Sequence, residues 1–219
     1  MKVRDFIKIY GAIILFHLAV VYRGDEGQML WLSKPLIAGT LLFFAISKIR
    51  EGGSFLMPLI PALVFSLFGD VALMFQQGPA FLIGMGAFAL AHVSYSYWYL
   101  KRGAGLKWQA FIIALALSLG AMYLLVQLVV LPAELSIPIY GYFGLLSLHF
   151  ILSAMAWQAQ KISFWPLLGI GLFIFSDWWI AWSKFGGGLD EHWHNRFIIM
   201  LSYGLAQGLI LLGIVAKKD

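Results

Sequence analysis

Two carboxylates, Asp70 and Asp177, each follow a run rich in phenylalanine within a long apolar stretch. An ionisable side chain inside an apolar helix is unfavourable unless it is paired, and marks a functional site by default. Two carboxyl groups can supply a general acid and a stabilising negative charge if their surroundings keep one protonated and the other ionised. A nearby cation such as Lys34, at the start of another apolar stretch, would favour the ionised form. The sequence therefore predicts acid–base chemistry among helices.

The composition excludes several classes of protein. The chain of 219 residues is 62% hydrophobic and 11% charged, and its mean hydropathy is +0.87. A soluble domain carries about 25% charged residues, so a soluble enzyme and a disordered tail are excluded. The chain has no cysteine, which excludes disulfides, thiolate zinc sites and a cysteine nucleophile. The net charge of +5 comes from bases at the ends of apolar runs, so we expect no nucleic-acid partner.

Apolar segments long enough to cross a bilayer, which takes roughly 20 helical residues, repeat along the whole chain. We predict eight helices, at residues 6–22, 31–47, 57–75, 80–100, 108–131, 137–157, 164–182 and 196–216. The predicted fold is an all-α polytopic integral membrane protein forming a single domain over residues 1–219. The first segment resembles a signal peptide, but no small-residue cleavage site precedes the turn at 23–26, so we expect it to be retained. The prolines are expected in connections or near helix ends.

The basic residues predict the orientation of these helices. One side of the membrane would carry Lys2, Arg4, Lys8, Lys48, Arg50, Lys101, Arg102, Lys107, Lys161, Lys217 and Lys218. The other side would carry Arg23, Lys34, Lys184 and Arg196. Because basic loops stay in the cytoplasm, both termini are predicted to be cytoplasmic. We expect the protein in the inner membrane of a bacterium.

The two aspartates are predicted to share one site in the outer half of the membrane. Each comes about 13 residues into an outward-running helix, and Lys34 lies near the same level. They occupy the third and seventh helices, an even offset that predicts a parallel four-plus-four repeat with Asp70 and Asp177 face to face. The alternative is an ion pair that only locks helices together.

Other polar residues recur on single faces of three predicted helices: His92, Ser96 and Tyr99; His149 and Ser153; Tyr203 and Gln207. Such side chains commonly form hydrogen bonds between membrane helices. We favour that role for His17, His149 and Ser153, whereas His92 and Tyr203 could belong to the site.

Competing kinds of site have weaker signals. His192 and His194, with Asp190 and Glu191, lie in a predicted outer loop, but a short His-x-His is a weak metal signal. There is no Gly-x-Ser-x-Gly motif of a serine hydrolase. We therefore expect no metal and no cofactor. A small-solute or proton-coupled transporter that uses the paired aspartates is the alternative function.

Five groups of residues resemble, in order, motifs of the YhhN-like transmembrane family. They are Lys34-Pro35-Leu36; 68–74; Gly86, Phe88, Ala91, His92 and Tyr95; Phe175-Ser176-Asp177 with Lys184-Phe185; and Tyr203 with Gln207. The resemblance covers residues 34 to 210 and implies an eight-helix hydrolase that cleaves the vinyl ether of lysoplasmalogens to a fatty aldehyde and a glycerophospho-base. It maps the family's two aspartates onto Asp70 and Asp177. Lys34, His92, Ser176, Tyr203 and Gln207 would support them.

The chemistry of a vinyl ether suits two aspartates, because cleavage begins with protonation of the β-carbon and passes through an oxocarbenium ion. Asp177 is our candidate for the acid, since the adjacent Trp178 and Trp179 make its surroundings apolar. The ionised Asp70 would stabilise the cation. Lys34 or Arg196 would meet the phosphate of a lysophospholipid held among membrane lipids. Tyr203 or Gln207 would position water or the head group, in a site open to the non-cytoplasmic side.

Overall fold

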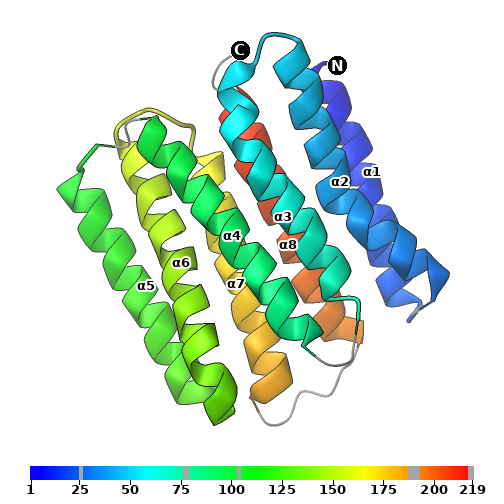
Figure 1. Cartoon of the computed structure of the whole chain (residues 1–219), viewed down its shortest axis with the longest axis vertical. Helices are drawn as coiled ribbons and strands as arrows, with labels where there is room; N and C mark the ends of the chain where they lie inside the picture. Colours follow the sequence, from blue (N-terminus) through cyan, green and yellow to red (C-terminus); the bar gives the residue numbers. More distant parts are fainter. Residues whose placement is uncertain (25–26, 76–78, 103–104, 187–192, 217–219) are drawn as a thin grey trace. The chain divides into compact units, whose positions relative to one another are not determined.

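The structure is a computed structural model that describes residues 1–24, 27–75, 79–102, 105–186 and 193–216. Those residues form helices and connections and no strand. The helices are α1 Val3–Tyr22, α2 Gln28–Arg50, η1 Ser54–Leu59, α3 Ile60–Ala72, α4 Ala80–Lys101, α5 Trp108–Leu128, α6 Ala133–Gln158, α7 Trp165–Phe185 and α8 Trp193–Ala216 (Figure 1). With η1 and α3 counted as one span, the described residues contain eight helices long and apolar enough to cross a membrane. The prediction of an all-α polytopic membrane protein is confirmed.

Several helices begin earlier than the sequence predicts. The second helix begins at Gln28 rather than residue 31, and the sixth at Ala133 rather than 137. Pro35 and Pro138 therefore lie inside α2 and α6 rather than at their ends. Both prolines stay within the first two or three turns, where a missing N–H disturbs less of the helix than in the middle.

The third predicted helix is divided. Ser54–Leu59 form a 3₁₀ turn, and the α-helix begins only at Ile60. Pro58 and Pro61 account for the change, because neither has an N–H for the backbone ladder. The helix also ends at Ala72 rather than residue 75, so Asp70 is in its last turn. Asp177, in contrast, is the thirteenth of the 21 residues of α7, as predicted.

The chain divides into two compact units, Met1–Trp98 and Tyr99–Asp219. In the first unit α1 packs on α2 and α2 on α3. The Phe6 ring stacks on Phe44 with centroids 3.9 Å apart. The Trp98 indole N–H donates a hydrogen bond of 3.0 Å to the Phe55 carbonyl, which joins the end of α4 to η1. The boundary falls in the last turn of α4, so the first unit holds α1, α2, α3 and most of α4, and the second unit holds the end of α4 with α5 to α8. The four-plus-four repeat and the single domain stay predictions.

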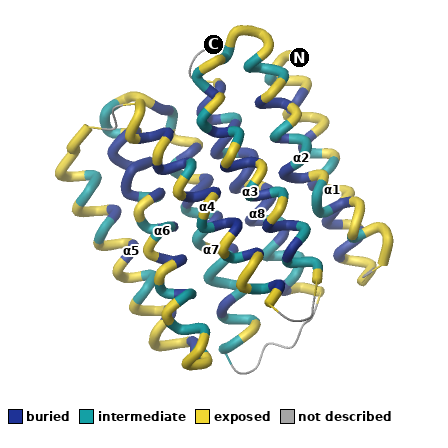
Figure 2. Tube along the Cα trace, viewed as in Figure 1, coloured by how far each residue is buried: buried dark blue, intermediate teal, exposed yellow. Residues whose placement is uncertain are grey.

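In the second unit α6 packs against α5 and α7, and α7 packs closely on α8. Gly169 makes that approach possible, because a β-carbon there would lie 2.9 Å from the Ala206 carbonyl oxygen and 2.9 Å from the Ile210 nitrogen. At the same end of the contact, the Ser163 hydroxyl just before α7 donates a hydrogen bond of 2.8 Å to the Gly213 carbonyl of α8. Much of α5 is exposed (Figure 2), and its exposed leucines and isoleucines suit contact with lipid.

The α7–α8 contact gives a first prediction. Gly169→Ala should destabilise the protein by about 2 kcal/mol, because the clash is with backbone atoms and the two helices must separate. Gly171→Ala is the matched control, since a β-carbon there meets the Phe150 ring at an ordinary 3.9 Å. Thermal unfolding of both variants in detergent measures the difference. Equal stability of the two variants would contradict the close approach of α7 and α8.

Candidate active site

In the first unit a buried carboxylate lies near a basic side chain from the preceding helix. Asp70 is 1% exposed and lies in the last turn of α3. The Lys34 ammonium on α2 is close enough to attract the Asp70 carboxylate electrostatically. The carbonyl groups at a helix C-terminus carry partial negative charge, so a buried carboxylate there needs a cation nearby. Lys34 meets that need, and the structure brings together these two predicted site residues.

A hydrogen bond from α1 lies beside this pair. His17 Nδ1 and Ser33 Oγ are 2.8 Å apart, and both side chains are fully buried. Ser33 immediately precedes Lys34, whose charge also acts on the His17 ring. The predicted interhelical role of His17 is confirmed.

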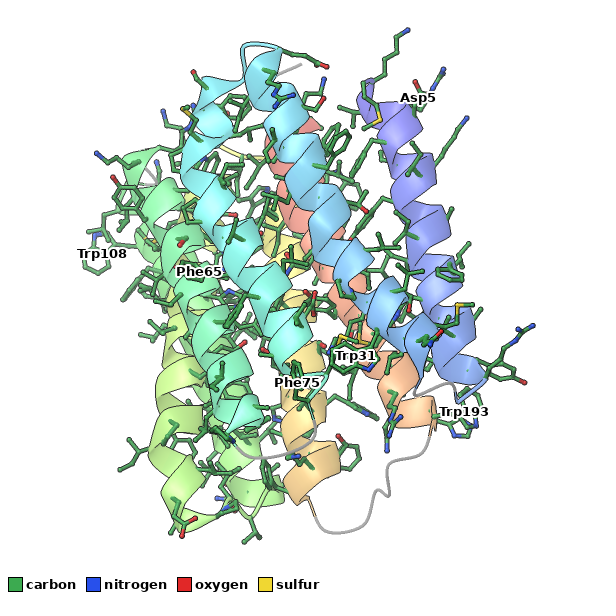
Figure 3. All side chains as sticks on the ribbon, turned by 45° about the vertical axis from the view of Figure 1, so that its right-hand side comes forward. Asp5, Trp31, Phe65, Phe75, Trp108 and Trp193 are labelled. Carbon is green, nitrogen blue, oxygen red and sulfur yellow. The ribbon has the colours of Figure 1, made fainter. Side chains whose placement is uncertain are left out.

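An aromatic contact joins the helix ends that carry Lys34 and Asp70. Trp31, three residues before Lys34, meets the ring of Phe75 edge to face, with centroids 5.0 Å apart (Figure 3). Phe75 lies just beyond the end of α3. The contact holds the start of α2 against the end of α3, and this juxtaposition places the ammonium near the carboxylate.

Helix α4 approaches the residue next to Asp70. A β-carbon on Gly69 would lie 2.7 Å from the Phe88 ring, so only a glycine admits this contact without a shift. His92, one turn further along α4, is fully buried, and its ring centroid is 6.3 Å from that of Tyr95. The structure therefore places His92 one turn from the α3–α4 contact, and its role in the site stays a prediction.

In the second unit the buried partner of the aspartate is a phenol. The Tyr142 hydroxyl on α6 donates a hydrogen bond to Oδ2 of Asp177 on α7. Tyr142 is buried. We did not predict this residue, although it lies seven residues before His149 and therefore on the same face of α6. In both units, then, the helix before the aspartate supplies its partner.

Three other predicted site residues lie at the α7–α8 contact. The Ser176 hydroxyl donates a hydrogen bond of 3.1 Å to the Ile199 carbonyl. Tyr203 meets the Phe173 ring edge to face at 5.5 Å. Gln207 Nε2 donates to the Tyr203 hydroxyl at 3.2 Å within α8. Ser176 and Tyr203 thus help to join the helix that carries Asp177 to α8.

In the second unit, His149 and Ser153, which were predicted to share one face of a helix, contact Tyr99 in the last turn of α4. The Ser153 hydroxyl donates to the Tyr99 hydroxyl at 3.5 Å, and the His149 ring centroid is 5.5 Å from that of Tyr99. The predicted contacts of His149 and Ser153 with a neighbouring helix are therefore present, and they join α6 to the end of α4.

Arg196 lies in the first turn of α8, where backbone N–H groups favour an anion. It is half-buried. Asn195 beside it accepts a hydrogen bond of 3.2 Å from the Trp179 indole. Trp179 in turn meets Trp182 edge to face at 5.0 Å. The start of α8 therefore combines a cation with an aromatic surface.

The weak metal signal is only partly within the described residues. His194 is exposed and stacks on Trp193 at 3.6 Å. The remaining residues of that motif, Asp190, Glu191 and His192, lie outside the described residues, as do Lys217 and Lys218 of the orientation argument. No cluster of three histidine or acidic side chains occurs in the described part of the chain.

Asp70 and Asp177 belong to different units. Their predicted face-to-face placement therefore stays a prediction. Each unit by itself offers one carboxyl group within a membrane-spanning helix and one polar partner for it, a cation in the first unit and a phenol in the second.

Eight apolar helices, with one carboxyl group inside a membrane-spanning helix of each unit, define a polytopic, integral membrane protein with a candidate acid–base site. The sequence matches the YhhN family over residues 29–214, and the chain belongs to that family. It is 30% identical to lysoplasmalogenase TMEM86B of Rattus norvegicus over 193 residues, 85% of this chain and 75% of the relative. It is 33% identical to lysoplasmalogenase TMEM86B of Homo sapiens over 189 residues, 85% of this chain and 77% of the relative. No solved structure matches the chain.

Proposed function

We propose that this protein is a membrane hydrolase that acts on ether bonds, a lysoplasmalogenase. Its substrate would be a lysophospholipid with a 1-alkenyl chain, and its products a fatty aldehyde and a glycerophospho-base. Relatives bearing that name match 85% of the chain. The structural observation that carries the proposal is the contrast between the partners of the two aspartates, a cation for Asp70 and a neutral phenol for Asp177.

This contrast supports the two roles that we propose. The Lys34 cation stabilises a carboxylate at Asp70. Asp177 meets a neutral donor, and α7 is rich in aromatic residues, so the uncharged acid is retained more readily there. Asp177 then serves as the general acid, and the Asp70 carboxylate as the negative charge beside the oxocarbenium ion.

Over one turnover each aspartate gives up one proton and takes up one proton. Asp177 transfers its proton to the β-carbon of the alkenyl chain, which leaves an oxocarbenium ion and an Asp177 carboxylate. Water adds to the ether carbon and gives its proton to Asp70. The hemiacetal then loses its hydroxyl proton to Asp177 while Asp70 protonates the departing glycerol oxygen. Aldehyde and alcohol are released, and both aspartates regain their starting states.

The place of the pair within its helices suits a lysolipid. Lys34 is in the second turn of α2 and Asp70 in the last turn of α3, so the pair lies toward one end of these spans. A vinyl ether lies next to the head group of its lipid, a few ångströms below the membrane surface. With the predicted orientation this end faces the non-cytoplasmic side of a bacterial inner membrane.

Arg196 is the proposed ligand of the substrate phosphate, because in this proposal the charge of Lys34 is used to stabilise the Asp70 carboxylate. Arg196→Gln should raise KM about 10-fold with little change in kcat, since a phosphate contact is made equally in the ground and transition states. Steady-state kinetics with a 1-alkenyl lysophospholipid measure the change, and Arg23→Gln is the control, because Arg23 is an exposed basic residue at the end of α1. A 1-alkenyl glycerol has no phosphate and should not distinguish wild type from Arg196→Gln. An equal defect with both substrates would overturn the assignment.

The function itself is tested with purified protein and three lysophospholipids that differ only at the sn-1 linkage, alkenyl, alkyl or acyl. Aldehyde should be released from the alkenyl lipid alone, because only a vinyl ether is activated by protonation at carbon. Release of fatty acid from the acyl lipid at a similar rate, or no aldehyde from the alkenyl lipid, would overturn the proposal.

A further inference from the structure

We propose that Tyr142 is a positioning residue that orients the Asp177 carboxyl group and directs its proton to one face of the substrate alkene. The proposal deepens the proposed function and depends on it. The observation that carries it is the hydrogen bond from the Tyr142 hydroxyl to Oδ2 of Asp177.

The hydrogen bond distinguishes the two oxygens of Asp177. The carboxyl group of an aspartate rotates over a broad range about its last torsion. Because the phenol donates to Oδ2, that oxygen acts as an acceptor, and the transferable proton belongs on Oδ1. The contact thus fixes both the plane of the acid and the oxygen that delivers the proton.

The surroundings of Tyr142 keep the phenol in one place. Its side chain is 8% exposed. Ile139 and Leu146, one turn away on either side along the same face of α6, are 3% and 0% exposed. A tyrosine packed in this way has little freedom to move its hydroxyl. The hydrogen bond to Asp177 therefore joins the acid to a rigid part of the second unit.

A neutral donor suits an acid better than a cation would. A cation beside Asp177 would stabilise the carboxylate before the reaction, as Lys34 does for Asp70. A phenol interacts modestly with the protonated acid and more strongly with the carboxylate that forms as the proton leaves, because hydrogen bonds to charged groups are stronger. Its contribution consequently grows in the transition state, and we expect it to accelerate proton transfer about 10- to 100-fold.

Tyr142→Phe removes the hydroxyl and keeps the ring. We expect kcat to fall about 10- to 100-fold while KM stays within about 2-fold, because the change acts on proton transfer and not on binding. Tyr140→Phe is the matched control, since Tyr140 is a half-buried tyrosine on the same helix. In D₂O, with immediate reduction of the aldehyde, wild type should place deuterium on one face of C2. Tyr142→Phe should lose much of this face selectivity, whereas Tyr140→Phe should keep it.

Two further variants distinguish an effect of Tyr142 on the orientation of Asp177 from damage to the fold. If Tyr142 acts through Asp177, the double variant Tyr142→Phe/Asp177→Asn should be no slower than Asp177→Asn alone. Tyr142→His, which keeps a ring donor, should recover part of the face selectivity. Wild-type rate and selectivity in Tyr142→Phe, or additive losses in the double variant, would overturn the proposal. Absence of aldehyde with the wild-type protein would instead overturn the proposed function.

Discussion

Asp177→Asn and Asp70→Asn should each reduce aldehyde release about 10³-fold or more, within the range lost when general acid–base catalysis is removed. Asparagine keeps the shape of each side chain, but it has no acidic proton to transfer at residue 177 and no charge to stabilise the cation at residue 70. The measurement is the initial rate of aldehyde release from a 1-alkenyl lysophospholipid, with purified variants that elute as the wild type does in detergent.

The matched control for these variants is Asp5→Asn, because Asp5 is exposed in the first turn of α1. Its rate should equal that of the wild type. The two active-site variants should also differ from each other in stability: Asp70→Asn leaves the Lys34 cation without its buried counter-ion, whereas Asp177→Asn still accepts the phenol hydrogen bond. Full activity in either variant would contradict the two-carboxylate mechanism.

The second large effect is expected at Lys34. Lys34→Gln leaves the Asp70 carboxylate buried at the C-terminal turn of α3 without a cation, which should cost about 3 kcal/mol of stability. Activity should fall at least about 10²-fold, because Asp70 then takes up a proton and no longer stabilises the oxocarbenium ion. Thermal unfolding and the rate of aldehyde release measure the two effects.

The double variant Lys34→Gln/Asp70→Asn tests the pairing itself. Removing both charges together should restore part of the stability lost in Lys34→Gln while activity stays absent. Lys48→Gln is the control, because the Lys48–Glu51 ion pair of 2.9 Å is near the surface and should contribute at most about 1 kcal/mol. Additive losses of stability in the double variant would contradict a direct interaction between Lys34 and Asp70.

The sequence predicts the fold well because each membrane span must satisfy its own backbone hydrogen bonds over about 20 residues. Hydropathy therefore identifies all eight spans, but it does not give the residues at which the helices begin and end. Prolines lie where the predicted and observed helices differ. At Pro58 and Pro61 the start of the third span is a 3₁₀ turn, whereas α2 continues through Pro35. Both outcomes depend on packing against neighbouring helices, which hydropathy does not include.

The sequence predicts the site less completely. A charged residue in an apolar run is conspicuous, so the sequence could identify Lys34 and Asp70 and predict that they lie close together. Tyr142 could not, because it is one of nine tyrosines, and a tyrosine in an apolar helix is ordinary. What makes Tyr142 important is its contact with Asp177, 35 residues away in the sequence. That contact depends on how α6 packs against α7, which no local pattern contains.

In the proposed mechanism the reaction begins when an enzyme carboxyl group protonates the alkenyl β-carbon. The most direct test is turnover of a 1-alkenyl lysophospholipid in D₂O, followed by immediate reduction of the aldehyde and mass analysis of the alcohol. We expect one deuterium atom at C2 of each product molecule, and a slower rate than in H₂O. Product without deuterium at C2, formed at the same rate in both solvents, would contradict it.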